Sequence, residues 1–276
     1  MGMRISTNIA SINAQRAMGN TQREIQSSYA QLSSGSRINK SSDDAAGLAI
    51  SETLKAQIRG FRQASRNAND GISLVQTTEG GLNEISNIIV RMRELGVQAS
   101  SDTVGDRERG MINVEIQQLK QEAQRIAVST RFGDTHLLDG SAQDFDFQVG
   151  VHNVKEEDRI TFQASKADSQ TSALGIDGLD YTDKEGAQSA LSILDEASVR
   201  VNKTRADLGA LQNRLQSTVT NLGVQDENLS AANSRIRDTD IAASTAELTR
   251  NSVLLQANTA VLAQANQTSN LALKLI

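Results

Sequence analysis

The chain has 276 residues and a formal net charge of −5, with no proline, no cysteine and only 3% aromatic residues. Proline breaks helix interiors, so its absence, where average usage is about 5%, is typical of a chain built from long helices. The lack of cysteine excludes disulfides and thiolate metal sites, and the negative charge argues against nucleic acid as a partner. No stretch approaches the roughly 20 apolar residues of a membrane span, and the N-terminus lacks the apolar run of a cleaved signal peptide. We therefore expect a cytoplasmic chain, or one exported without such a peptide.

A first helix is predicted over residues 3–33, with Gly35 just beyond its end. Its large aliphatic side chains follow helical spacing: Ile5, Ile9, Ile12, Ile25 and Leu32. The remaining faces are mainly Gln, Asn and Ser, so this helix would be weakly stable alone. We expect it to need a partner helix.

A second helix is predicted over residues 45–99, after the N-capping sequence SSDD at 41–44. Apolar residues recur every seven positions along it: Leu54, Phe61, Ala68, Val75, Leu82 and Ile89. A repeat of seven keeps one apolar stripe on one side of a slightly supercoiled helix, which favours pairing with another helix. Gly71, Gly80 and Gly81 each weaken the helix by about 1 kcal/mol relative to Ala, and we interpret them as close-packing positions.

The middle of the chain changes its periodicity. A shorter helix is predicted over 107–129, and near Phe132 the apolar spacing becomes two, as in strands. Apolar residues alternate with polar ones on both sides of a charged loop, which predicts a β-hairpin: Phe145, Phe147, Ile160 and Phe162. We expect a β region over about 132–165 and, because residues 166–187 are polar and glycine-rich, a short surface excursion there.

A long helix predicted over 188–235 has the strongest repeat of seven: Leu194, Val201, Leu208, Leu215, Leu222, Leu229 and Ile236. At a rise of about 1.5 Å per residue this stripe is roughly 65 Å long, so another helix must cover it. The repeat then slips and resumes in a C-terminal series: Ile241, Leu248, Leu255 and Leu262. From residue 241 on, only Glu247, Arg250 and Lys274 are charged, so we expect the series from Leu248 to Leu262 to be buried between subunits of an assembly.

Catalytic chemistry has little support in this sequence. His136 and His152 are the only histidines, and no zinc ligands stand at the required spacing. Asp144 and Asp146 alternate with phenylalanines, a pattern in which the carboxylates face water. No Gly-rich phosphate loop, Ser/His/Asp set or EF-hand loop is present. We predict a protein that is not an enzyme and has no cofactor and no metal site.

Together the patterns predict a mostly α fold of long antiparallel helices in coiled-coil and bundle packing, with a small β-hairpin region and the chain termini brought together. An inner domain is predicted from residues 1–44 and 237–276, and an outer rod from residues 45–236. The two long rods are expected to form the core of this outer bundle: Leu54, Phe61, Val75, Leu82, Ile89, Leu208, Leu215, Leu222 and Leu229.

Several long motifs resemble bacterial flagellin closely: ISTNIASINAQR, LSSGSRINKSSDDAAGLAISE, RNANDGISLVQTTEGGLNEI, RVNKTRADLGALQNRLQSTVTNL and SVLLQANTAVLAQANQ. The resemblance covers residues 3–140 and 190–276 in the family's order. It implies a structural subunit that polymerises into the helical flagellar filament, the motility propeller, with its terminal helices forming a coiled coil in the filament core. Because so few residues separate the two halves, the chain resembles a short flagellin with little or no outer domain.

The resemblance also implies location and partners. Flagellins are exported unfolded through the flagellum's own type III apparatus, after a chaperone has bound the C-terminal helix. The subunit would then be secreted and extracellular, with other copies of itself, the filament cap and the hook-associated proteins as partners. The implied polymerisation core consists of terminal aliphatic residues: Ile5, Ile9, Ile12, Ile25, Leu32, Leu248, Leu255 and Leu262.

A second implied site lies in the outer bundle. In many flagellins a Toll-like innate receptor binds a patch that includes the arginine and leucine of a motif like QRVREL and a glutamate on the next helix. Arg91, Leu95 and Glu115 match these positions here, while Val90 stands where the family often has Gln. The alternative interpretation is that these residues pack one subunit against another. A further departure is Gly133-Asp134, where the family usually has Asn-Gly.

Two other functions remain open. The junction protein between hook and filament shares the terminal motifs but usually matches them less well, and the strong C-terminal match argues against it. A non-flagellar coiled-coil scaffold would explain the repeats of seven alone. Polymerisation into tubes distinguishes a filament subunit from such a scaffold.

Overall fold

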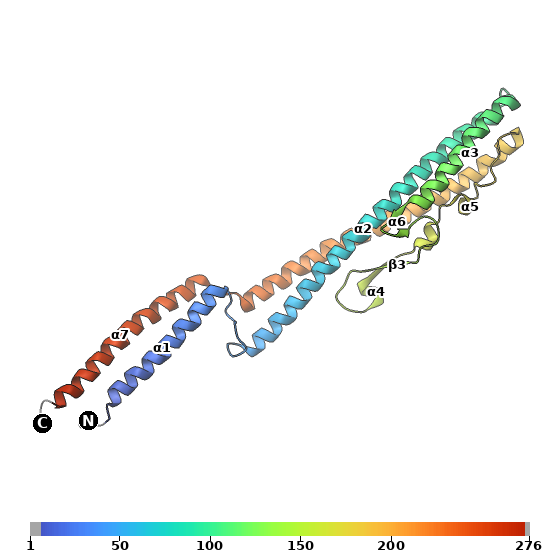
Figure 1. Cartoon of the computed structure of the whole chain (residues 1–276). Coiled ribbons are helices and arrows are strands. Elements are labelled where there is room, and N and C mark those ends of the chain that lie inside the picture. The colour runs from blue at the N-terminus through green and yellow to red at the C-terminus, as the bar shows by residue number, and fades with distance from the viewer. Residues whose placement is uncertain (1–6, 274–276) are drawn as a thin grey trace. The chain divides into compact units, whose positions relative to one another are not determined.

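The computed structural model describes residues 7–273, with side chains placed for residues 7–267. Long helices dominate it: α1 (Ile9–Ser34), α2 (Ala45–Ala99), α3 (Asp106–Ser129), α6 (Lys184–Arg237) and α7 (Ile241–Leu273) (Figure 1). The chain divides into a terminal unit, Met1–Ile58 with Glu227–Ile276, and a central unit, Arg59–Asp226. The mostly α fold is therefore confirmed. The terminal unit extends beyond the predicted inner domain into the first turns of α2 and the last turns of α6.

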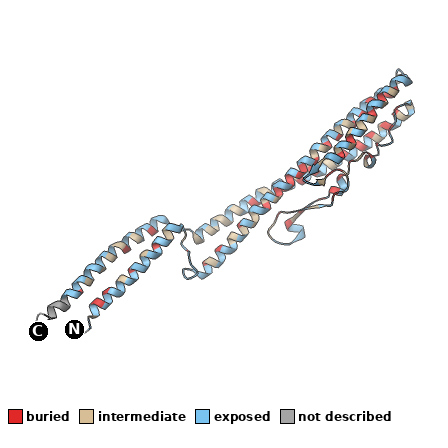
Figure 2. Ribbon diagram, in the orientation of Figure 1, coloured by how far each residue is buried: buried red, intermediate tan, exposed pale blue. Residues whose placement is uncertain are grey.

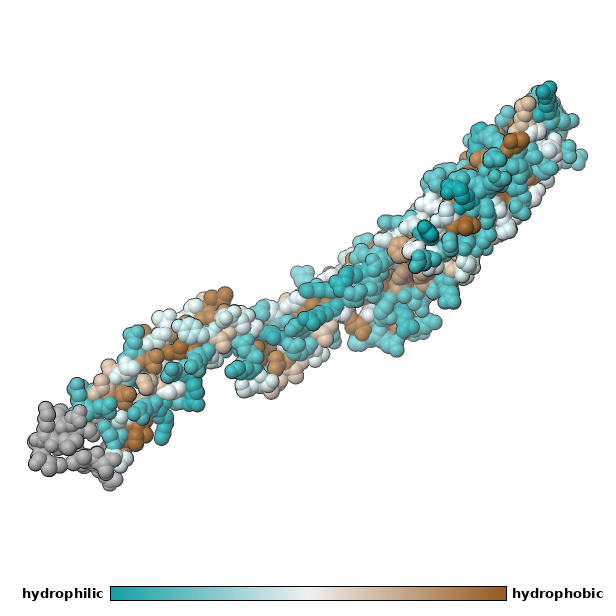
Figure 3. Space-filling view, viewed as in Figure 1, coloured by the Kyte–Doolittle hydropathy of each residue, from teal (hydrophilic) through white to brown (hydrophobic). Residues whose placement is uncertain are grey.

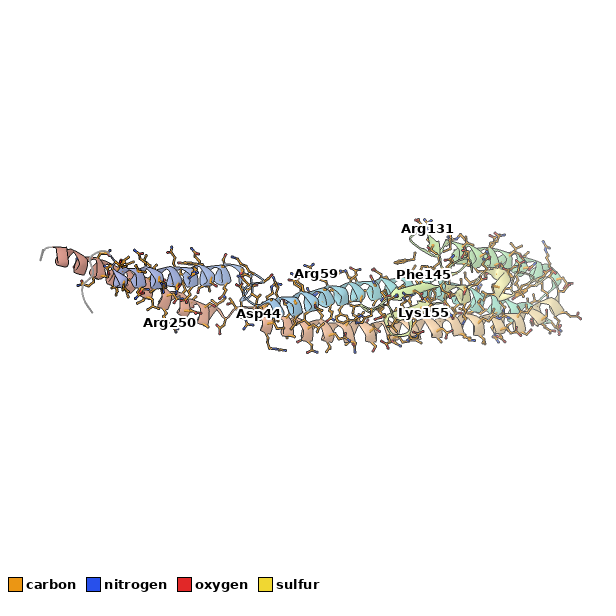
Figure 4. The ribbon with its side chains drawn as sticks, turned by 90° about the horizontal axis from the view of Figure 1, so that it is seen from below. Asp44, Arg59, Arg131, Phe145, Lys155 and Arg250 are labelled. Carbon is orange, nitrogen blue, oxygen red and sulfur yellow. The ribbon has the colours of Figure 1, made fainter. Side chains whose placement is uncertain are left out.

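Polar caps define where helices of the terminal unit begin and end. α1 follows Asn8, whose Oδ1 accepts a hydrogen bond from the Ser11 amide at 3.1 Å. It ends at Gly35, whose φ of 68° is a left-handed conformation that glycine adopts without strain. Asp44, labelled in Figure 4, accepts a hydrogen bond from the Gly47 amide at 2.8 Å and so caps α2. The cap predicted within SSDD is thus in place.

A short backbone bridge connects the two linkers of the terminal unit. Ser36 and Asp238 form an isolated antiparallel pair, and the Arg37 amide donates to the Arg237 carbonyl at 2.7 Å. The Arg237 guanidinium also donates to Glu52 at 2.6 Å, which holds the pKa of that carboxyl below its usual value. These contacts fix the α1–α2 linker against the α6–α7 linker.

The central unit has a continuous hydrophobic core between α2, α3 and α6, along which Figure 2 shows the buried residues concentrated. Six of the nine residues predicted for the outer bundle core are buried: Val75, Leu82, Ile89, Leu208, Leu215 and Leu222. The other three are half-buried: Leu54, Phe61 and Leu229. The sevenfold repeats thus place the largest apolar side chains inside the bundle, where α3 adds a third helix to cover them.

Two of the three mid-helix glycines in α2 are close-packing positions, as predicted. A Cβ on Gly81 would lie 2.6 Å from the Thr130 hydroxyl oxygen, and a Cβ on Gly71 would lie 3.1 Å from the Phe147 ring. Gly80 faces open space instead. Any larger side chain at Gly81 would displace the segment that follows α3.

The β region consists of two small antiparallel hairpins. β1 (Arg131–Phe132) pairs with β2 (Thr135–His136), and β3 (Phe145–Gln148) pairs with β4 (Arg159–Phe162) after the single helical turn α4 (Lys155–Asp158). The Phe145 and Phe162 rings stack with their centroids 6.2 Å apart, as the predicted alternation requires, and Figure 4 labels Phe145. Gly133 has φ 60° at the first position of the β1–β2 turn, where a type II′ turn needs glycine. The departure from Asn-Gly therefore still supports a tight hairpin.

The prediction of a surface excursion over residues 166–187 is wrong for the apolar residues of that segment. Residues 164–181, here called the strap, contain η1 (Ala164–Ala167) and α5 (Thr171–Leu174). Its largest apolar side chains are all buried in the central core: Leu174, Ile176, Leu179 and Tyr181. The strap is therefore part of the bundle and closes one side of it.

Polar side chains of α3 explain why so polar a segment is held against the bundle. They form one stripe at helical spacing: Asn113, Gln117, Lys120 and Gln124. Gln117 donates to the Leu179 carbonyl at 3.2 Å, and Gln124 accepts from the Thr171 amide at 3.0 Å. These bonds satisfy backbone groups that burial would otherwise leave unpaired, at a cost of about 1–3 kcal/mol each.

Tyr181 anchors the end of the strap. Its side chain is fully buried, and its hydroxyl donates to the Met92 carbonyl of α2 at 3.2 Å. Burial raises the pKa of the phenol to about 12, because ionisation would place a charge in the apolar core. The strap is thereby fixed to α2 as well as to α3.

Candidate polymerisation surface

The two terminal helices, α1 and α7, lie side by side along their lengths (Figure 1). The side chains that they bury are small or polar: Ser11, Ala14, Thr21 and Ser28 on α1, and Ser244, Asn251 and Ala265 on α7. Small residues allow close approach of two helices, but they remove little apolar area from water. The contact between α1 and α7 therefore provides little hydrophobic stabilisation.

Hydrogen bonds cross this contact at several levels. The Asn8 amide donates to Ala265 O at 2.9 Å, the Ser11 hydroxyl donates to Asn266 Oδ1 at 3.1 Å, and the Asn258 amide donates to Thr21 Oγ1 at 3.2 Å. Residue numbers rise along α1 as they fall along α7, so the two helices are antiparallel. The bonds fix one register between them.

Larger apolar side chains of the same helices are exposed. Their exposed fractions lie between 45% and 65%: Ile9, Ile12, Ile241, Val253, Leu254 and Val261. Figure 3 shows hydrophobic patches over both helices. Burying one such side chain elsewhere would gain about 1.5–3 kcal/mol, so a surface of this kind indicates a partner.

The residues predicted for the polymerisation core fall into three groups. Ile9 and Ile12 are exposed. A further five are half-buried beside the α1–α7 contact: Ile25, Leu32, Leu248, Leu255 and Leu262. Ile5 lies outside the described residues. None of those described is fully buried within the chain, so each still has apolar area available to another molecule.

The second predicted site is partly assembled on the surface of the central unit. Arg91 Nη2 lies 2.9 Å from Glu115 Oε1, and Arg91 Nη1 lies 3.1 Å from Glu94 Oε2. Hydrogen bonds to Glu115 first and to Glu94 second raise the pKa of the Arg91 guanidinium. The three side chains are about half exposed. A charged cluster of this kind joins α2 to α3 and is open to a partner.

Leu95 does not belong to that surface. Its side chain is only 3% exposed and lies in the central core cluster. It is one turn from Arg91, but it points between the helices instead of outward. The prediction that Leu95 contacts a receptor or another subunit is therefore wrong for the folded chain. Four apolar residues near Arg91 and Glu115 in sequence are exposed on the same two helices: Val90, Val97, Met111 and Val114.

Within the described residues, no cluster of three or more His, Asp or Glu side chains has the geometry of a metal site. Across the same part of the chain, no helix is long and apolar enough to span a membrane.

Comparison with family models decides the identity of the chain. The model of the bacterial flagellin N-terminal helical region matches residues 5–143, and the model of the C-terminal helical region matches residues 191–276. The chain belongs to the bacterial flagellin family. It is therefore a structural subunit of the flagellar filament, as the sequence motifs implied.

Relatives and solved structures agree with this assignment. A flagellin from Halalkalibacterium halodurans is 45% identical over 274 residues, covering 99% of this chain and 100% of that protein. The crystal structure of Bacillus cereus flagellin has 32% identity and a TM-score of 0.51, covering 61% of this chain and 94% of that one. A putative flagellar hook-associated protein from Vibrio parahaemolyticus has a TM-score of 0.58 over 71% of this chain at 11% identity, which shows a shared fold alone.

Three exposed residues of this flagellin were missed by the sequence reasoning as members of the surface. Val253, Leu254 and Val261 lie on α7 outside the series of Ile241, Leu248, Leu255 and Leu262. Each of them lies one or two positions before a member of that series, and successive helical residues point about 100° apart. Paired apolar residues, as in SVLLQ and AVLAQ, were the available signal that α7 has a second apolar face.

Proposed function

We propose that this flagellin polymerises by burying the outward faces of α1 and α7 between neighbouring subunits. The observation that supports the proposal is the division of side chains in the terminal unit. Small and polar residues are the ones buried in the contact between the two helices, and the larger aliphatic residues remain exposed or half-buried. Only further subunits would remove that apolar area from water in a homopolymer.

The proposed polymerisation core includes the half-buried residues beside the α1–α7 contact and the exposed residues of the same two helices. It comprises Ile5, Ile9, Ile12, Ile25 and Leu32, together with Ile241, Leu248, Val253, Leu254, Leu255, Val261 and Leu262. A core of this kind explains why the terminal helices tolerate so few charges. Each buried charge would need a partner or cost several kcal/mol.

The same exposed surface supports the proposed partners before assembly. An apolar helix such as α7 would associate non-specifically unless it were covered, so we propose that an export chaperone binds it in the cell. We further propose that the chain leaves through the flagellar type III apparatus, meets the cap and hook-associated proteins, and functions outside the cell. The proposed role is structural, without enzymatic activity.

Substitution of Leu255 by Asp tests the proposal directly. The new carboxylate would lie in the apolar stripe beside exposed Leu254, where burial between subunits would leave it unpaired. Purified chain is seeded with short filament fragments, and elongation is followed by electron microscopy. We expect the variant to form no filaments, while its central unit unfolds at the wild-type temperature because Leu255 lies in the terminal unit.

The matched control is Gln256→Asp, which adds the same charge one residue further along α7 at an exposed polar position. We expect this control to elongate. Normal filaments from Leu255→Asp would contradict the proposed surface. A wild-type chain that never elongates from seeds would instead support a scaffold or a junction protein.

A second proposed contact surface is the Arg91 cluster with its exposed neighbours. Charged residues and exposed valines and a methionine on the same two helices give a mixed surface typical of protein interfaces. We propose that it contacts a neighbouring subunit. Recognition by a Toll-like receptor would have to use Arg91 and Glu115 without Leu95, because Leu95 is buried.

A further inference from the structure

The contact between α1 and α7 repeats every seven residues. Thr21 on α1 meets Asn258 on α7 through a hydrogen bond of 3.2 Å. Seven residues onward along α1 and seven back along α7, buried Ser28 is level with buried Asn251. We call Thr21, Ser28, Asn251 and Asn258 the polar seam. The central two levels of the contact are therefore polar on both helices.

This seam is not arranged for stability. Asn251 is only 4% exposed, and its Nδ2 has no hydrogen-bond partner among the described residues. A buried donor left unpaired is destabilising, whereas a leucine of similar size would gain from burial. Polar residues at these positions therefore weaken the helix pair relative to an apolar seam.

The sequence offers competing ways to pair the same helices. Apolar residues on α7 repeat every seven positions through Leu248, Leu255 and Leu262, and Ile25 and Leu32 on α1 have the same spacing. Sliding one helix by seven residues would align these stripes again, so apolar contacts alone do not distinguish one register from the next. The hydrogen-bonded pair of Thr21 and Asn258 does distinguish them, because a slip of seven residues sets Asn258 against Ala14 in one direction and Thr21 against Ala265 in the other.

We propose that the polar seam, acting with the backbone bridge between Ser36 and Asp238, selects the register of α1 against α7 and thereby sets where the outward apolar residues lie along the filament axis. A slip of seven residues would shift one helix by about 10.5 Å, at about 1.5 Å per residue. Ile25 and Leu254, which are level with each other in the observed register, would then be offset along the helix axis by that distance. This inference rests on the proposed polymerisation surface and assigns positioning roles to four residues that contact no other subunit in that proposal.

Disulfide formation reports the register, because the chain has no cysteine of its own. Ala14 and Ala265 are buried one further repeat of seven from Thr21 and Asn258, so Ala14→Cys with Ala265→Cys tests the observed register. The full-length chain is oxidised before and after seeding, and the fraction with an intrachain disulfide is measured by non-reducing electrophoresis and peptide mass spectrometry. In the parent double-cysteine protein we expect this disulfide to predominate.

Two variants are compared in that background. The first, Thr21→Val, Ser28→Ala, Asn251→Leu and Asn258→Leu, removes the polar seam and fills it with apolar groups. We expect the disulfide fraction to fall by about two-fold or more as registers mix. The second, Thr21→Asn with Asn258→Thr, exchanges the hydrogen-bonding partners between the helices. We expect it to restore the parent fraction.

Either of two results would overturn the inference. An apolar seam that gives the parent disulfide fraction would show that the register is set elsewhere. An exchange variant that falls as far as the apolar one would show that side-chain shape matters, and not the hydrogen-bonded pair. If instead the proposed polymerisation surface is wrong, Leu255→Asp will elongate normally. That result does not depend on the disulfide fraction, so the two proposals fail in distinguishable ways.

Discussion

The terminal and central units use the same kind of helix in opposite ways. In the central unit, α2, α3 and α6 place leucines, isoleucines and valines inside, and the strap closes the remaining side. In the terminal unit, α1 and α7 place serine, threonine and asparagine inside and aliphatic residues outside. One unit completes its hydrophobic core within the chain, and the other, in the proposed filament, would complete it with further copies. Burial, not helix content, separates a folded domain from an assembly element.

The largest expected effect that tests this contrast is in the central core. Leu82 is fully buried, so Leu82→Ala should lower the free energy of unfolding by about 2–5 kcal/mol through lost burial and the cavity left behind. Urea denaturation of the soluble chain measures it. Its matched control is Leu254→Ala on the outward face of α7, which should change the same quantity by less than about 0.5 kcal/mol while slowing elongation from seeds. Equal destabilisation by the two substitutions would remove the distinction between the units.

A smaller loss of stability is expected when the anchor of the strap is changed. Tyr181→Phe removes the hydrogen bond to the Met92 carbonyl and should cost about 1 kcal/mol, because that carbonyl stays buried. The pH dependence gives a second readout. With the folded pKa raised from 10.0 to about 12, the contribution of the neutral phenol is intact below pH 10.0 and is lost as pH rises toward 12.

Urea denaturation of the wild-type protein and of Tyr181→Phe between about pH 10 and 12 measures the free energy of unfolding of each. The variant has no phenol to ionise, so the difference in unfolding free energy between the two proteins should narrow as pH rises. A constant gap would mean that the phenol does not ionise differently in the folded chain.

The smallest expected effect is at the exposed Arg91 cluster. Glu115→Gln removes one partner of Arg91, and because both groups are about half exposed the change in unfolding free energy should stay below about 1 kcal/mol. Elongation rate is the more informative measurement. A reduced rate with unchanged stability would assign the cluster to contact with a neighbouring subunit, and an unchanged rate would exclude Glu115 from that contact.

The repeats of seven made most of the fold predictable. They depend on local spacing, so the bounds of α2 and the buried positions from Val75 to Leu222 follow from the sequence alone. The repeats did not predict that Leu95 is buried, because Leu95 is not a member of the sevenfold series and lies only one turn from the exposed Arg91. For the terminal helices, the repeats identified the apolar residues but did not show that the contact between α1 and α7 would be polar.

The strap could not be predicted because its stability is not local. Its composition is that of a loop, and its backbone groups are satisfied by a stripe on α3 that includes Gln117 and Gln124. Asn and Gln at helical spacing usually indicate a solvated face. Only their pairing with a distant backbone segment gives them a structural role.

The bridge between the two linkers has a consequence for the order of folding. Arg37 donates to the Ile236 carbonyl across 199 positions of sequence, a closure that in an unfolded chain would cost on the order of 5 kcal/mol of entropy. Within the central unit, Arg62 already meets Asp226 at 3.0 Å. Once that unit has folded, only the short segments beyond these two residues remain to be closed. A weakly held pair of terminal helices can therefore form late, because the rest of the chain has already brought its two ends to the same place.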